Sequence, residues 1–268
     1  MSGPPVRDLA EAVREHVRPG TRVYLGNFGA QLFCVGHEMI RQGVRDVDLV
    51  VASGGVLMDQ LLGAGCLRSV TFGHCWSPVG PAPAYNFRRA AEGGTGVALH
   101  EMSLGLLTAA LTAGAWDVPF LPVPDRAGTG YVDEDWSGGL LDTASCRFGT
   151  SPVVRAEVPD VAFVHADLAD PAGNGVVRGP LGEVVVAAQA ARTVVLVAEE
   201  LASSATVRER GITIPGLLVS AVVHRPGALA PDGALGRYDR DVAAYERYAR
   251  LAATPEGFRS WLEREVME

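Results

Sequence analysis

The segment from residue 159 to residue 200 constrains the fold of this chain more than any other stretch. It contains two extended apolar runs, Val161–Ala166 and Thr193–Ala198, and a helical stretch between them, Glu183–Arg192. Both runs are rich in valine and are almost continuously apolar, whereas a half-exposed strand would alternate apolar and polar residues. The segment therefore predicts a β-α-β unit whose two parallel strands are buried on both faces of a sheet.

Polar side chains lie at the carboxyl ends of both predicted strands. His165, Asp167 and Asp170 end the first strand, and Glu199 and Glu200 follow the second. Because ligands of open parallel sheets bind at the carboxyl ends of the strands, these positions are candidates for a site. We expect one of the two glutamates to hydrogen-bond neighbouring loops and hold a pocket. The alternative is a surface pair that ends the strand.

The turn Asp170-Pro171-Ala172-Gly173-Asn174 has a composition that favours a local structural role. An aspartate in such a turn accepts hydrogen bonds from its own turn, and a glycine supplies a positive φ angle. We therefore predict that Asp170 stabilises the fold and that Gly173 has a positive φ. A catalytic role for Asp170 is the alternative.

Composition excludes several classes of function. The chain of 268 residues is 48% hydrophobic, which is enough for a full α/β core, and we expect one domain over residues 1–268. The net charge of −8 argues against a nucleic-acid or anionic-membrane partner. The chain has no lysine, which excludes a lysine Schiff base and a Walker A loop. With no apolar run of 18 residues and no signal pattern, the sequence predicts a soluble, cytoplasmic protein without a membrane partner.

Two small-residue loops follow predicted strands near the start of the chain. Gly26-Asn27-Phe28-Gly29 follows the strand at Arg22–Leu25, and Ser53-Gly54-Gly55 follows the strand at Val47–Ala52. A glycine-bearing loop between a strand and a helix lets backbone N–H groups approach a ligand. Neither loop matches the dinucleotide fingerprint, so ligand contact and an ordinary βα turn both remain open.

One histidine and four cysteines are further candidates. His74 follows a predicted strand at Ser69–Phe72, where a hydrogen-bonding role is favoured over acid or base catalysis. The spacing of the cysteines fits neither a C-x-x-C pair nor a metal site, so disulfides and zinc are disfavoured. No activating base is visible beside Cys34 or Cys75. We interpret the cysteines as buried or free thiols.

Periodicity predicts the remaining elements. Residues 125–159 lack a clear period but contain Tyr131, Trp136 and Phe148, which indicates a functional or interfacial arm. The other predicted elements are helices at Val6–Val17, Cys34–Gln42, Leu57–Leu62, Met102–Ala115 and Val242–Leu251, a last helix after Thr254, and a buried strand at Leu217–Val223.

The order and spacing of several short motifs resemble the α subunit of class I CoA-transferases, most closely the glutaconate CoA-transferase type. The resemblance covers nearly the whole chain. The motifs are the two glycine loops described above, Pro119-Phe120-Leu121-Pro122, His165-Ala166 with Ala169-Asp170 and Gly173-Asn174, Glu199-Glu200, Ile214-Pro215-Gly216 and Tyr238-Asp239.

This resemblance implies an open, mostly parallel α/β sheet flanked by helices and a paired β subunit of similar fold, in a heterotetramer or larger assembly. In that family the catalytic glutamate belongs to the β subunit, and the α subunit shapes the acyl pocket. Accordingly, no glutamate here stands in a Glu-Asn-Gly context, and Glu92-Gly93-Gly94 is typical of a loop. We expect no catalytic residue in this chain, no metal and no cofactor beyond the coenzyme A thioester substrate. The expected substrate-binding residues are Gly26, Asn27, Phe28, Gly29, Ser53, Gly54, Gly55, His74, Glu101, Gly128, Gly130 and Glu199.

Three departures from the family pattern concern the substrate. Relatives often have basic residues where this chain has Gln31-Leu32-Phe33, and many have Gly-Ala-His where it has Gly227-Ala228-Leu229. A steroid ring-opening hydrolase branch has a carboxylate within the stretch that is Ser103-Leu104-Gly105 here. These departures favour an apolar or unusual acyl group over a dicarboxylate.

CoA transfer between an acyl-CoA and a carboxylic acid is thus the predicted activity. Hydrolysis or decarboxylation on the same scaffold is one alternative, and a non-catalytic acyl-CoA-binding relative is another, because a fold does not fix a function.

Overall fold

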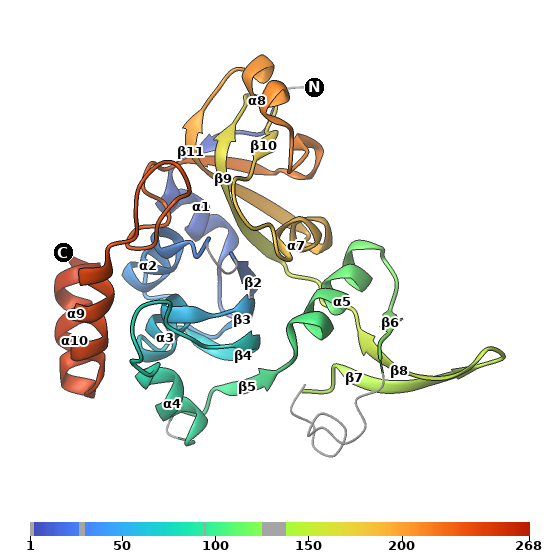
Figure 1. Ribbon diagram of the computed structural model, residues 1–268, viewed down its shortest axis with the longest axis horizontal. Coiled ribbons are helices and arrows are strands. Elements are labelled where there is room, and N and C mark those ends of the chain that lie inside the picture. The colour runs from blue at the N-terminus through green and yellow to red at the C-terminus, as the bar shows by residue number, and fades with distance from the viewer. Residues whose placement is uncertain (1–2, 27–29, 94, 125–137) are drawn as a thin grey trace.

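A computed structural model describes residues 3–26, 30–93, 95–124 and 138–268 (Figure 1). Its main sheet has nine strands, in the order β1-β12-β11-β9-β2-β3-β4-β5, with β10 paired to β9. The pairs along this order are parallel, and β10 is antiparallel to β9. The predicted open, mostly parallel sheet is therefore confirmed. The strands are β1 (Val6–Arg7), β2 (Arg22–Leu25), β3 (Val47–Ser53), β4 (Leu67–His74), β5 (Ala98–Glu101), β9 (Val161–Ala169), β10 (Gly175–Val176), β11 (Thr193–Leu201) and β12 (Ala221–His224).

The sheet is buried between two apolar layers. Successive residues of β2 belong to different layers: Val23 and Leu25 pack in one core cluster and Tyr24 in the other. The first cluster includes residues of α1, α2, α3, α9 and α10, and the second includes residues of α5 and α7. This two-sided burial is the reason that the central strands β3, β9 and β11 are rich in apolar residues. The helices are α1 (Leu9–His16), α2 (Phe33–Arg41), α3 (Gly55–Gly63), α4 (Tyr85–Ala91), α5 (Leu104–Ala115), α7 (Val184–Ala190), α8 (Ser204–Arg210), α9 (Val242–Ala252) and α10 (Pro255–Leu262).

The β-α-β unit formed by β9, α7 and β11 is confirmed, with one correction. The two strands pair in parallel along most of their length, from Thr193 opposite Val161 to Leu201 opposite Ala169. Both strands are longer than the sequence predicted, and Glu199 and Glu200 lie within β11 rather than after it. The strand continues through these charged residues because its neighbour β9 extends equally far and supplies hydrogen-bond partners.

Three predicted boundaries were wrong for a common reason. The first helix begins at Leu9, capped by Asp8, because Val6 and Arg7 form β1 and pair with β12. The predicted strand at Leu217–Val223 contains a 3-10 turn, η1 (Gly216–Leu218), and the strand begins only at Ala221. Helix α5 begins at Leu104 behind the cap Ser103, not at Met102. In each case pairing or capping with other residues decided a boundary that periodicity cannot locate.

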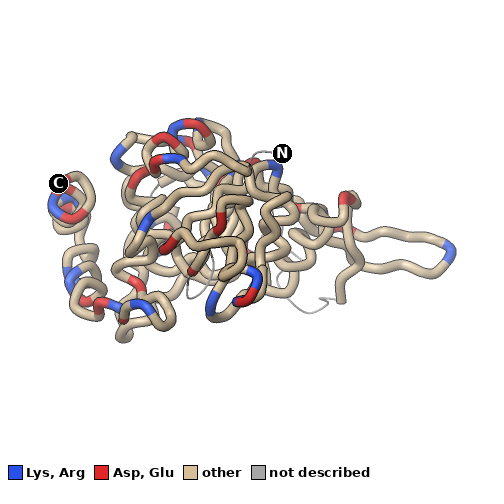
Figure 2. Tube along the Cα trace, turned by 90° about the horizontal axis from the view of Figure 1, so that it is seen from above, with Lys and Arg blue, Asp and Glu red and all other residues tan. Residues whose placement is uncertain are grey.

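A β-hairpin extends from the body of the molecule (Figure 1). Its strands are β7 (Leu141–Cys146) and β8 (Gly149–Arg155), and β8 also pairs with β6 (Phe120–Pro122) in a separate three-stranded sheet. The sequence of residues 125–159, which lacks a clear period, did not indicate these strands. Figure 2 shows the hairpin as an arm with arginine colour at its tip, where Arg147 and Phe148 join the strands.

The chain ends in two adjacent helices, α9 and α10, followed by a π-helical turn, η2 (Glu263–Met267). Asp241 and Thr254 cap the two helices through their side chains, as the Thr254 pattern predicted for the second. Among the residues that the structure describes, no helix is both long and apolar enough to span a membrane.

Candidate functional site

A cavity of about 440 Å³ lies at the carboxyl ends of β3 and β4. Much of its wall is apolar, and its polar groups come from four separate segments of the chain. This combination of an apolar wall with a few polar groups at strand ends is typical of a small-molecule site. The lining residues are Ala52, Ser53, His74, Trp76, Leu104, Thr108, Pro180, Gly182 and Glu183.

Ser53 and His74 form a hydrogen-bonded pair in this cavity. They are the last residues of β3 and β4 and lie opposite each other in the register, with Ser53 Oγ 2.9 Å from His74 Nε2. The bond agrees with the predicted hydrogen-bonding role of His74. If His74 donates its Nε2–H to Ser53 Oγ, the serine hydroxyl is free to donate its own hydrogen bond into the cavity.

Hydrogen bonds within the protein hold the loop after β3. They engage groups that the sequence suggested could contact a ligand. The Gly54 N–H donates to the His74 carbonyl oxygen at 3.0 Å, so it is already engaged within the loop. Gly55 has a φ of +53°, and a Cβ there would lie 1.9 Å from Gln31 Nε2. Only glycine satisfies both constraints. Gln31, at a position where relatives often have basic residues, is itself buried and hydrogen-bonds the Ser53 carbonyl oxygen and the Leu57 N–H.

Glu183 is the buried carboxyl group of the cavity. It is the N-cap residue of α7, but its side chain makes no capping bond and instead lines the cavity. Its Oε1 accepts a hydrogen bond of 3.2 Å from the hydroxyl of Tyr24, a fully buried residue of β2. Burial raises the pKa of the Glu183 carboxyl group, although hydrogen bonds from its own N–H, from Tyr24 and from Ala52 act in the opposite direction.

Glu199 lies in a second polar group at the same edge of the sheet. Its Oε1 accepts hydrogen bonds from His165 Nε2 at 3.1 Å, the Ala228 N–H at 3.1 Å and the Tyr238 hydroxyl at 2.6 Å, while Oε2 accepts from the Gly227 N–H at 2.7 Å. Burial alone would raise the pKa of Glu199, but the bonds from His165, Tyr238 and Gly227 outweigh it and lower the pKa. This carboxylate ties two loops to β11.

The predicted turn at Asp170 is confirmed. Asp170 Oδ1 accepts hydrogen bonds from the N–H groups of Ala172 at 2.9 Å and Asn174 at 2.8 Å, and Gly173 has a φ of +81°. Asn174 in turn accepts a bond of 2.8 Å from the Gly216 N–H. The turn therefore uses both oxygens of Asp170 internally, since Oδ2 accepts from Asn174 Nδ2 at 3.0 Å.

Several other predicted substrate-binding residues do not line this cavity. Gly26 follows β2, and Glu101 is an exposed residue of β5 that does not line the cavity. Glu199 does not line it either, so its contact with substrate stays a prediction. The predicted residues Asn27, Phe28, Gly29, Gly128 and Gly130, and the aromatic residues Tyr131 and Trp136, lie outside the residues that the structure describes.

The cysteines are free thiols, in agreement with the sequence interpretation. Burial raises the pKa of the Cys34 thiol to about 12, and burial raises the pKa of Cys66 to about 11. Burial likewise raises the pKa of Cys75 well above its usual value. Thiols with such pKa values are poor nucleophiles at neutral pH.

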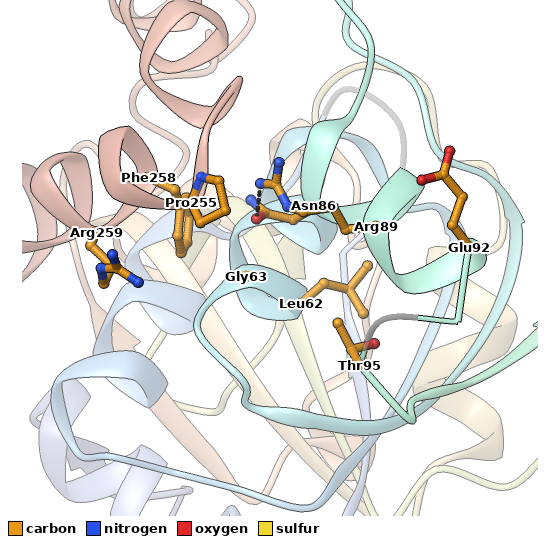
Figure 3. A pocket seen from close by; sticks show the side chains of 9 residues that line it. All are labelled: Leu62, Gly63, Asn86, Arg89, Glu92, Thr95, Pro255, Phe258 and Arg259. Atoms are coloured by element: carbon orange, nitrogen blue, oxygen red, sulfur yellow. Dashed lines mark hydrogen bonds between the residues drawn. The ribbon is translucent and has the colours of Figure 1, made fainter.

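A second, larger cavity of about 510 Å³ lies elsewhere, between α3, α4 and α10 (Figure 3). Its arginines already have partners: Arg89 donates to Asn86 Oδ1 and to the Ala252 carbonyl oxygen, and Arg259 pairs with Glu256. Helices rather than strand ends form its walls, so the strand-end rule favours the smaller cavity as the reaction site.

Sequence reasoning found Ser53 and His74 separately but missed their contact, and it missed Glu183 and Tyr24. Glu183 was predicted only as the start of a helix, where an acidic residue is ordinary. The available signal was Tyr24, a polar aromatic residue between the apolar Val23 and Leu25 of β2, since a buried tyrosine hydroxyl usually has a partner.

The chain is similar in sequence to known proteins over most of its length. The sequence profile described as coenzyme A transferase matches residues 6–225. One subunit of the 3-oxoadipate CoA-transferase of Pseudomonas knackmussii is 33% identical over 263 residues, which cover 95% of this chain and 91% of that protein.

Two solved structures also resemble the chain. The crystal structure of glutaconate coenzyme A-transferase from Acidaminococcus fermentans has a TM-score of 0.89 at 26% identity and covers 98% of this chain and 88% of its own. A variant of the decarboxylase AibA/AibB has a TM-score of 0.86 at 28% identity and covers 98% of this chain and 100% of its own.

Proposed function

Because this chain belongs to the coenzyme A transferase family and is an enzyme subunit, we propose that it works as the α subunit of a heteromeric CoA-transferase. The complex moves CoA between an acyl-CoA and a carboxylic acid, with no cofactor beyond the coenzyme A thioester substrate. We place it in the cytoplasm and treat residues 1–268 as one domain. The relative from P. knackmussii is named as one subunit of its enzyme, which supports the existence of a second subunit here.

The observation that carries this proposal is the cavity at the ends of β3 and β4. Its apolar wall suits an acyl group, and the Ser53 hydroxyl, oriented by His74 at 2.9 Å, can donate a hydrogen bond to an oxygen of that group. Such a donor stabilises charge that develops on a carbonyl oxygen when a nucleophile attacks it. The nucleophile itself we assign to a glutamate of the partner subunit.

Two buried groups of this chain, Glu199 and Cys34, support that assignment. Glu199 is held by four hydrogen bonds, and burial raises the pKa of Cys34 to about 12. Neither group is prepared to attack a thioester, because the hydrogen bonds to Glu199 stabilise its charge and lower its pKa, and a cysteine nucleophile needs a thiolate.

Exposed aromatic side chains support a partner surface. Trp76 at the cavity is 51% exposed, and Phe148 at the hairpin tip is 84% exposed, with Arg147 4.6 Å from its ring centroid. Aromatic residues are enriched in the cores of protein interfaces. We therefore propose that the partner covers the cavity and contacts the arm in a heterotetramer or larger assembly.

The decisive experiment locates the covalent adduct. This chain, its partner and the mixture are each incubated with acyl-CoA, trapped with borohydride or hydroxylamine, and measured by intact mass. We expect no transfer and no adduct with this chain alone, and both with the mixture, with the adduct on the partner. A modified residue on this chain, or turnover by it alone, would contradict the proposal.

A matched variant separates transfer from the alternatives. Ser53→Ala should slow transfer by about 10²-fold, the usual effect of removing one donor to a developing oxyanion, and leave the adduct on the partner. If the adduct is on Ser53 and disappears in this variant, the complex is a hydrolase that uses the Ser53–His74 pair. A partner whose nucleophile position is not glutamate would favour decarboxylation or hydrolysis, and saturable acyl-CoA binding without turnover would favour a non-catalytic relative.

A further inference from the structure

Glu183 has an orientation that helix formation does not explain. Short N-cap side chains such as those of serine and aspartate accept hydrogen bonds from the first turn of their own helix, and glutamate is not among these preferred residues. Glu183 makes no such bond to α7. Its side chain lines the cavity instead and is only 6% exposed.

The position of Glu183 is fixed by a residue from another part of the sheet. The Tyr24 hydroxyl donates to Glu183 Oε1 at 3.2 Å, and Tyr24 is fully buried on β2. Together with the bonds from its own N–H and from the Ala52 N–H, this bond uses about three of the four acceptor positions of the carboxyl group. Capacity for a hydrogen bond to a bound molecule therefore remains.

The surroundings of Glu183 disfavour a second negative charge. Ala52, Trp76, Leu104 and Pro180 contribute to the same wall, and none of the cavity-lining residues that the structure describes is an arginine or lysine. Two carboxylates in a poorly solvated site repel each other, and at least one must take up a proton. A neutral carboxyl group, by contrast, can both donate and accept a hydrogen bond.

We propose that Glu183 determines acyl selectivity: its carboxyl group hydrogen-bonds a hydroxyl or keto oxygen on an otherwise apolar acyl group and disfavours an acyl group that ends in a carboxylate. Tyr24 is the positioning residue that holds Glu183 toward the cavity. This inference rests on the proposed function, since it concerns the acyl group of the same site.

The test uses the complex of this chain with its partner, together with three acyl-CoA thioesters that have the same carbon chain. One is unsubstituted, one has a hydroxyl or keto oxygen, and one ends in a carboxylate. In the wild type we expect kcat/KM for the oxygenated thioester to exceed that for the unsubstituted one by about tenfold, the effect of one hydrogen bond. The carboxylate-ended thioester should be the poorest substrate.

Three variants distinguish selectivity from general damage. Glu183→Leu should bring the oxygenated-to-unsubstituted ratio close to one. Glu183→Gln should retain that ratio and improve relative kcat/KM for the carboxylate-ended thioester, because an amide hydrogen-bonds without charge. Thr112→Val, at a threonine of the same helix α5 that does not line the cavity, should leave the ratio unchanged.

The outcomes separate this inference from the proposed function. Equal losses for all three thioesters in Glu183→Leu and Glu183→Gln, with the ratio intact, would show a purely structural Glu183 and overturn the inference alone. A wild-type complex that transfers CoA from none of the three would overturn the proposed function and the inference together.

Discussion

Glu183 and Glu199 are two buried glutamates beside the same edge of the sheet, and they differ in what surrounds their carboxyl groups. Glu199 accepts hydrogen bonds from His165, Tyr238 and two backbone N–H groups, and these bonds lower its pKa against the effect of burial. Glu183 accepts a longer bond from Tyr24 and faces a cavity, and burial raises its pKa.

The difference separates a structural carboxylate from one that is available to a ligand. A buried carboxylate that four donors surround holds loops in place and does not face the cavity. A buried carboxyl group that lines a cavity retains hydrogen-bonding capacity at a cost to stability. Burial alone, which is 4% exposure for Glu199 and 6% for Glu183, does not distinguish the two residues.

Replacing Glu199 is expected to have the largest effect on stability. Glu199→Ala removes one partner of a buried pair and leaves His165, Tyr238 and two N–H groups without their acceptor, so the free energy of unfolding should fall by about 3 to 5 kcal/mol. Urea unfolding of the complex, at one fixed protein concentration, measures this loss of stability. The neighbouring Glu200, which is exposed and pairs with Arg237, supplies the control. Glu200→Ala should cost less than about 1 kcal/mol, and equal effects of the two variants would refute the comparison.

Asp170 extends the comparison to a second saturated carboxylate. Asp170→Ala should lower the free energy of unfolding by about 1 to 3 kcal/mol, because three hydrogen bonds of its turn lose their acceptor. Turnover per folded molecule should change little. Asp142→Ala, at an exposed aspartate that bonds its neighbour Thr143, is the control. A large loss of turnover per folded molecule, with little loss of stability, would place Asp170 among the catalytic residues.

The pH dependence of stability should have opposite signs for the two glutamates. The folded-state pKa of Glu199 is lowered, so its contribution is present above the unfolded pKa and is lost as the pH falls through the folded value. The folded-state pKa of Glu183 is raised, so stability decreases as the pH rises from the unfolded pKa to the folded one. Each contribution is about 1.4 kcal/mol per pKa unit.

Urea unfolding of the wild type, Glu199→Gln and Glu183→Gln across a pH series measures these slopes. In Glu199→Gln the decrease in the free energy of unfolding toward low pH should disappear. In Glu183→Gln the decrease toward higher pH should disappear. Slopes of the same sign for both glutamates would show that the two environments do not differ as described.

The smallest effect is expected when Glu183 and its partner are both made apolar. The double variant Tyr24→Phe with Glu183→Leu should change the free energy of unfolding by less than about 1 kcal/mol, because the hydroxyl and the carboxyl group that hydrogen-bond each other are removed together. Tyr24→Phe and Glu183→Leu measured singly show how far the two sites are coupled. A loss in the double variant as large as that of Glu199→Ala would mean that Glu183 is structural after all.

The sequence by itself determined the β-α-β unit, the local turn at Asp170 and the family. Short, valine-rich, continuously apolar runs favour strands buried on both faces, and a turn of Asp-Pro-Ala-Gly-Asn type has its hydrogen-bond partners within five residues. These features depend on residues that are close in the sequence, so local sequence patterns are sufficient to predict them. The β7–β8 hairpin lacked such a pattern because β7 and the outer half of β8 are largely exposed and have no buried face to impose alternation.

Only the tertiary structure decided which polar residues meet. Tyr24 and Glu183 are separated by 159 residues, and Glu199 and Tyr238 by 39, so no local spacing could relate them. The sequence placed Glu199 among the site residues and Glu183 at a helix start, whereas the structure turns Glu183 into the cavity and surrounds Glu199 with donors. The physical reason is that a carboxyl group acquires its pKa and its free lone pairs from the atoms that pack around it, and parallel strands bring those atoms together from distant parts of the chain.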